Sequence, residues 1–191
     1  MTEQALSQSE GRDRDTDRNC DGDTDRAERI VPATVADLQT VLGQHARFWG
    51  ERDLRALHLA ALVQEFPATC LAAVADDGIR GYIFGFVTPD HLGYVHLIAT
   101  RDDTRGTGLG RRLYAAFTDA ARAQGAQRLK AITSLDNAGS VAFHRSLGFA
   151  VREVADYNGA GQPRIVFTRE LERWSPARKP AALAHDVHDA G

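Results

Sequence analysis

The sequence has few cysteines and no strong charge bias. Cys20 and Cys70 are the two cysteines among 191 residues, and no C-x-x-C or cysteine–histidine spacing occurs. This argues against a disulfide scaffold and a structural zinc site and is typical of the reducing cytoplasm. The net charge of −3 argues against a general binder of nucleic acid or anionic membranes. No apolar run approaches the roughly 20 residues of a membrane span, and the polar stretch Met1–Asp25 has no secretory signal. We therefore expect a cytoplasmic protein without nucleic-acid or membrane partners.

The two ends of the chain differ in composition from its middle. Residues 1–29 hold nine acidic and five basic side chains and almost no large apolar residue. Such a segment cannot offset its ordering entropy by burial, which predicts a disordered mixed-charge tail. Residues 175–191 begin with breaker-rich sequence and predict a flexible C-terminal tail. One folded domain, residues 30–174, is left between them.

Apolar periodicity changes repeatedly along this domain. Alternating or short apolar runs predict strands at 30–33, 69–75, 79–88, 93–100, 128–134, 150–157 and 164–171. Helical spacing predicts helices at 34–45, 52–65, 105–124 and 138–147, the first opened by a capping box of Thr34 and Asp37. The order βααβββαβαββ combines hairpins with helical crossovers and predicts an α/β domain with mixed strand pairing.

The strongest chemical signal is the glycine-rich stretch Arg105-Gly-Thr-Gly-Leu-Gly110, between a predicted strand and a predicted helix. Backbone N–H groups at a helix N-terminus favour an anion, typically a phosphate. A P-loop is disfavoured because the G-K-[ST] ending is missing. A dinucleotide fingerprint is disfavoured because Arg111 stands where a small residue is needed, and because three strands precede the strand of this turn.

This arrangement resembles the GNAT family of N-acetyltransferases. In that family an R/Q-x-x-G-x-G/A turn after the fourth strand binds the pyrophosphate of acetyl-CoA, and Gly108 and Gly110 occupy the two small positions here. The segment from Asn137 to Phe149 is similar to the family's N-x6-Y-x3-G-F motif. The resemblance covers nearly all of residues 30–171. It implies a mostly antiparallel central sheet with helices on both faces, acetyl-CoA as co-substrate, and transfer of an acetyl group to an amine.

The resemblance also implies which residues contact acetyl-CoA. The end of the fourth strand would bind the pantetheine arm through its backbone, and one N–H there would polarise the thioester carbonyl. Asn137 would contact the cofactor arm, or cap the following helix, or do both. The implied cofactor-binding residues are Ile98, Ala99, Thr100, Arg105, Gly106, Thr107, Gly108, Leu109, Gly110, Arg111, Asn137 and His144.

His144 stands where the family usually has a tyrosine facing the coenzyme sulfur. An imidazole can donate the proton that a leaving thiolate needs, so His144 is a candidate general acid. The alternative is a surface histidine beside Arg145.

A base must take the proton of the attacking amine. Tyr94, His96 and Ile98 share one strand face by the period-2 rule, with Val95 and Leu97 on the other. Histidines occur in arylalkylamine acetyltransferases at the positions that match Tyr94 and His96, so both are candidate catalytic residues and His96 is the candidate base. A core histidine with satisfied hydrogen bonds is the competing interpretation.

The resemblance implies that the acceptor contacts residues 45–53 and the turn Tyr157–Gln162. Phe48 and Trp49 could stack on it, or both could be core residues. We expect a small-molecule amine as acceptor, with direct attack in a ternary complex and a possible homodimer. A non-catalytic acyl-CoA sensor, or an N-acyltransferase for a protein N-terminus or lysine, remains the alternative.

Overall fold

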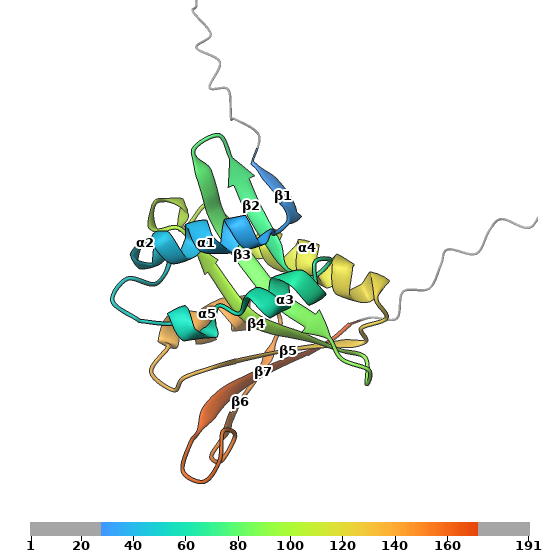
Figure 1. Cartoon of the computed structure of the whole chain (residues 1–191). Coiled ribbons are helices and arrows are strands. Elements are labelled where there is room, and N and C mark those ends of the chain that lie inside the picture. The colour runs from blue at the N-terminus through green and yellow to red at the C-terminus, as the bar shows by residue number, and fades with distance from the viewer. Residues whose placement is uncertain (1–27, 172–191) are drawn as a thin grey trace, which may run out of the picture.

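The computed structural model describes residues 28–171 as a seven-stranded sheet with helices on both faces (Figure 1). The strands lie in the order β1-β2-β3-β4-β5-β7-β6, and only β4 and β5 run parallel among these neighbours. The predicted mixed, mostly antiparallel sheet is confirmed. The strands are β1 (Arg29–Pro32), β2 (Leu71–Ala75), β3 (Gly78–Val87), β4 (Leu92–Thr100), β5 (Arg128–Thr133), β6 (Ala150–Val154) and β7 (Arg164–Glu170).

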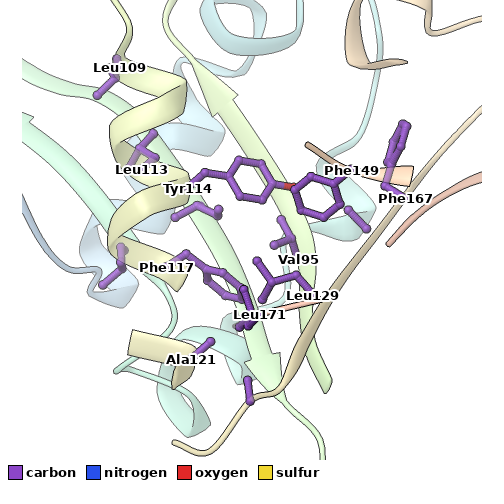
Figure 2. Close-up of a cluster of buried hydrophobic side chains, with 14 of the residues drawn as sticks. Val95, Leu109, Leu113, Tyr114, Phe117, Ala121, Leu129, Phe149, Phe167 and Leu171 are labelled. Carbon is purple, nitrogen blue, oxygen red and sulfur yellow. The ribbon is translucent and has the colours of Figure 1, made fainter. Parts of the chain in front are cut away.

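The sheet separates the core into two clusters, and each is covered by its own set of helices. One face of the sheet is covered by α1 (Val35–Gly43), α2 (His45–Trp49) and α3 (Ala60–Glu65), which pack on a cluster that includes Leu38, Val41 and Phe48. The other face is covered by α4 (Leu109–Ala123) and α5 (Ala138–Ser146). Figure 2 shows α4 directing Leu113, Tyr114 and Phe117 into this second cluster. No helix in the described part of the chain is long and apolar enough to cross a membrane.

Local sequence signals place most elements within a few residues of their predicted bounds. The capping box at the start of α1 is present: the Thr34 side chain accepts from the Asp37 amide, and the Asp37 carboxylate accepts from the Thr34 amide. The predicted tails lie almost wholly outside the described residues, and their disorder stays a prediction.

The predicted helix at 52–65 is wrong in its first half. In its place the structure has a 3-10 turn, η1 (Arg55–Leu57), followed by α3. The short helix α2, which follows α1, was not predicted as a separate element. Side-chain hydrogen bonds accompany the difference: Leu54 donates its amide to His45 Nε2 and accepts at its carbonyl from His58 Nδ1. The two histidine side chains thus satisfy the backbone groups of Leu54 outside a regular helix, and the Leu57 amide closes the 3-10 turn on the same carbonyl at 3.0 Å.

A β-bulge in β4 changes which side chains face the same way. Phe84 and Gly85 of β3 pair with Leu97 and Val95 of β4, which makes His96 the extra residue. Gly85 permits the close approach, because a Cβ there would lie 2.3 Å from the carbonyl oxygen of Tyr94. The bulge is why Val95 packs in the cluster under α4 while Leu97, two residues on, packs in the cluster under α1–α3.

The bulge corrects one prediction about β4. Ile98 packs against the cluster under α4 and does not share a face with His96, whose ring bonds η1 on the opposite side. The period-2 rule fails here because it assumes an unbroken ladder, and the extra residue shifts the alternation by one.

Candidate active site

Strand β4 separates from β5 halfway along its length. The two strands pair over Leu92–Val95 and Arg128–Ala131, after which β4 continues to Thr100 and β5 to Thr133 (Figure 1). Beyond Val95, the edge of β4 that faces β5 is therefore open to a ligand. The predicted contacts Ile98, Ala99 and Thr100 lie on this open stretch. Because strand side chains point to the two faces of the sheet, the backbone N–H and C=O groups are the ones that lie along the open edge.

His96 stands at the start of the open stretch and is half-buried. Its Nε2 lies 2.9 Å from the carbonyl oxygen of Leu57 in η1. A carbonyl only accepts, so Nε2 carries a proton, and in the neutral ring Nδ1 keeps the lone pair. The ring of Tyr94 lies 6.5 Å from that of His96, and burial raises the pKa of Tyr94 to about 12. The geometry therefore gives His96 a fixed orientation and a basic nitrogen, and it gives Tyr94 a neutral hydroxyl.

The glycine-rich turn lies between η2 (Asp102–Thr104) and α4. Gly106 and Gly108 have φ of 80° and 82°, a left-handed conformation that favours glycine. Gly110 is small for another reason, since a Cβ there would meet the Phe143 ring at 3.2 Å. Within residues 28–171, the amides of Gly106, Gly108, Leu109 and Gly110 make no hydrogen bond to the protein. Four such amides at the start of a 15-residue helix suit an anion such as a pyrophosphate.

Arginines surround this turn and tie it to its neighbours. Arg105 reaches the Phe48 carbonyl of α2 at 3.5 Å, and Arg111 reaches the Ser146 carbonyl and hydroxyl at 3.4 Å. Arg101, just before η2, is 4% exposed and forms ion pairs with Asp77 and Asp103. The turn is thus held against both α2 and α5, and Arg105 and Arg111, which form no ion pair within residues 28–171, add positive charge beside the free amides.

Asn137 caps the N-terminus of α5, one of the two roles that the sequence predicts for it. Its Oδ1 accepts from the Ser140 amide at 3.1 Å, and its Nδ2 donates to Thr133 Oγ1 at 2.9 Å. These bonds join the end of β5 to α5 on the far side of the open stretch. Whether the second hydrogen of Nδ2 also contacts a cofactor stays a prediction.

His144 lies in the core, contrary to the surface alternative, and is 3% exposed. Its ring stacks on Phe167 with centroids 3.9 Å apart. Nδ1 lies 2.8 Å from the Ser140 carbonyl oxygen, so it carries the proton, and Nε2 accepts from the Tyr114 hydroxyl at 2.6 Å. Burial lowers the pKa of His144 and raises that of Tyr114. A neutral ring with both nitrogens engaged must first gain a proton before it can act as an acid, and the acid role of His144 stays a prediction.

Comparison with known proteins agrees with this geometry. A sequence profile of the acetyltransferase (GNAT) family matches residues 36–149, which include the glycine turn and α5. The chain belongs to the GNAT family. An L-methionine sulfoximine/L-methionine sulfone acetyltransferase of Pseudomonas paraeruginosa is 45% identical over 129 residues, 63% of this chain and 75% of that protein.

Solved structures share the GNAT fold. The PaiA N-acetyltransferase of Thermoplasma acidophilum, in complex with coenzyme A, has a TM-score of 0.63 at 15% identity and covers 76% of this chain and 99% of that one. A ribosomal-protein-alanine N-acetyltransferase of Brucella melitensis has a TM-score of 0.57 at 27% identity, over 75% and 99%. The family match and the named relatives make this protein a GNAT-type N-acetyltransferase.

Cys70 is unsuited to form an acetyl-enzyme in this GNAT domain. It precedes β2, has no exposed surface, and its thiol donates to the carbonyls of Leu62 and Gly85 at 3.4 and 3.6 Å. Burial raises its pKa to about 11, which keeps it a neutral thiol.

A buried polar cluster next to His96 was not predicted. Trp49 donates its indole N–H to the Tyr82 hydroxyl at 2.7 Å, and that hydroxyl donates to His58 Nε2 at 2.6 Å. His58 Nδ1 then donates to the Leu54 carbonyl at 2.8 Å. The two predicted acceptor contacts therefore differ in position. Phe48 is a core residue, 3% exposed, whereas Trp49 belongs to the hydrogen-bonded cluster beside His96. No local signal could show this, because Tyr82 is 24 residues from His58.

Proposed function

We propose that this GNAT protein transfers the acetyl group of acetyl-CoA to the amine of a small, amino-acid-like molecule by direct attack in a ternary complex. The observation that carries the proposal is the placement of three features along one path: the free amides of the glycine turn, the open edge of β4, and the oriented His96. The relative that acts on L-methionine sulfoximine and L-methionine sulfone, 45% identical, supports a small acceptor.

The residues present fit acetyl-CoA. The free amides of Gly106, Gly108, Leu109 and Gly110 would hold its pyrophosphate, and backbone groups of Ile98–Thr100 would bind the pantetheine arm as an added strand. Bound there, acetyl-CoA supplies an activated thioester. A backbone N–H of the open stretch would stabilise the charge that develops on the carbonyl oxygen.

His96 performs the proton transfer at the amine in this proposal. The amine attacks the thioester carbon, the carbon–sulfur bond breaks, and the amine proton passes to His96 Nδ1, directly or through one water. The bond from Nε2 to the Leu57 carbonyl fixes the tautomer of the neutral ring, so that Nδ1 is the nitrogen available to accept the proton. The CoA thiolate takes up a proton as it leaves, for which His144 is the sequence-based candidate.

Replacement of His96 by glutamine tests the proposal. Gln can keep the bond to the Leu57 carbonyl but has no basic nitrogen, so kcat with L-methionine sulfone should fall about 100-fold. The fall should shrink as pH rises and more of the amine is already neutral. His91→Asn is the matched control, because His91 is an exposed histidine in the turn before β4.

The assay measures acetyl-CoA-dependent thiol release with L-methionine sulfone and with an alanine-initiated peptide. Release with the peptide but not the sulfone would move the acceptor to protein N-termini; the Brucella structure is named for a ribosomal-protein alanine. Thermal stabilisation by acetyl-CoA without release on any amine would favour the sensor alternative. Equal kcat and pH dependence in wild type and His96→Gln would remove His96 from the mechanism.

A further inference from the structure

Lys130 lies beside the candidate catalytic residues on an uncovered part of the sheet. It pairs in register with Tyr94 across the parallel β4–β5 ladder, which puts both side chains on the same face. The core cluster beneath α1, α2 and α3 draws its strand residues from β2, β3 and β4, so no described helix packs over β5, β7 and β6 on that face. Figure 1 shows these three strands extending past the helices in front.

Tyr157 holds the Lys130 ammonium in place. This tyrosine comes from the β6–β7 loop, and Lys130 Nζ lies 4.8 Å from the centre of its ring. The loop itself is ordered by a bond from the Gly161 amide to Asp156 Oδ1 at 2.7 Å. The phenol of Tyr157 also interacts electrostatically with that of Tyr94 and contributes to the raised pKa of Tyr94. Lys130 thus has Tyr94 as its neighbour across the ladder and Tyr157 as its ring contact, and Tyr94 lies beside His96.

The Lys130 ammonium has no anionic partner in the described part of the chain. Ten ion pairs of other residues are present there, but none reaches Lys130, which is half-buried. A half-buried cation held only by an aromatic face is a suitable partner for an incoming anion, because a charge-assisted hydrogen bond recovers the lost hydration.

We propose that Lys130, positioned by Tyr157, binds the carboxylate of an α-amino-acid acceptor whose amine faces His96. This inference rests on the proposed function and specifies its substrate class. Lys130 belongs to the strand next to that of Tyr94, about 4.8 Å away, and a lysine side chain spans a further several ångströms. Two hydrogen bonds of about 3 Å and the short separation of amine and carboxylate in an α-amino acid together bridge roughly 9 Å. His96 lies two residues beyond Tyr94, the partner of Lys130, so two positions along the strand and one strand across separate their backbones by about 8 Å, which this reach matches.

The test compares L-methionine sulfone with its carboxamide, which keeps the amine but loses the negative charge. The specificity is the ratio of kcat/KM for acid over amide, measured in wild type, Lys130→Met, Lys130→Arg and Arg152→Met. Comparison between variants removes the difference in amine basicity between the two compounds. Lys130→Met should lower this ratio about 10- to 100-fold, because kcat/KM should fall for the acid and stay unchanged for the amide. Lys130→Arg should restore much of the ratio. Arg152→Met, an exposed change on β6, is the control.

An unchanged ratio in Lys130→Met, or an equal loss for acid and amide, overturns the carboxylate site. Thermal shift with each compound in the presence of CoA separates this failure from failure of the proposed function. If neither compound is acetylated but the acid alone stabilises wild type and not Lys130→Met, the carboxylate site stands and the acetyl-transfer proposal falls. If the acid gives no Lys130-dependent stabilisation and no Lys130-dependent turnover, the inference is wrong.

Discussion

The hydrogen bond from Tyr114 to His144 allows a quantitative prediction about the core beneath α4. Tyr114→Phe removes only a hydroxyl, but it leaves His144 Nε2 buried without a donor, which should destabilise the fold by about 1–3 kcal/mol. His144→Leu leaves the Tyr114 hydroxyl without its acceptor and also removes the stacking on Phe167, for a total of about 2–4 kcal/mol.

The double variant should be much less destabilised than the sum of the two single variants. With both partners apolar, no buried polar group is left without a partner at this contact, so the coupling energy should be about 1–3 kcal/mol. Urea unfolding of the four proteins, followed by fluorescence or circular dichroism, measures this energy. Additive effects, within about 0.5 kcal/mol, would refute the assigned hydrogen bond and with it the neutral, Nδ1-protonated form of His144.

The same variants test the acid role that the sequence assigns to His144. If His144 protonates the leaving thiolate, His144→Leu should lower kcat and remove a group from the basic limb of the pH–rate profile, where a general acid loses its proton. A folded His144→Leu protein with wild-type kcat and pH profile would show that this position serves packing alone.

Two further predictions concern acidity and the glycine turn. Burial lowers the pKa of both His58 and His144, so each is neutral when folded and takes up a proton on unfolding below pH 6.5. Stability should be complete above that pH and should fall as pH drops, by at most about 1.4 kcal/mol per pH unit for each histidine; urea midpoints that stay constant from pH 7 to 5 would contradict this. In the turn, Gly108→Ala strains a residue with φ of 82°, and Gly110→Ala brings a methyl 3.2 Å from the Phe143 ring. Both should reduce the thermal shift produced by acetyl-CoA, and wild-type shifts in the two variants would argue against anion binding by these amides.

Much of the architecture was predictable because its signals are local. The Thr34–Asp37 capping box, the glycine turn and the Asn137 cap each depend on contacts within a few residues, and all lie where the pattern predicts them. The alternation of apolar residues likewise locates the strands, and the two family motifs identify the GNAT domain. Sterics and hydrogen bonding at short range are properties that residue order encodes directly.

The positions of the candidate catalytic side chains depend on contacts between distant segments. The bulge at His96 arises from the pairing of β3 with β4, and the orientation of its ring depends on Leu57, 39 residues away. His144 is buried because Tyr114 and Phe167 come from other elements, and Lys130 joins the site only because β5 lies next to β4 and the Tyr157 loop covers it. A strand's pattern shows which of its residues are apolar, but register and bulges, set by the neighbouring strand, determine what each side chain meets.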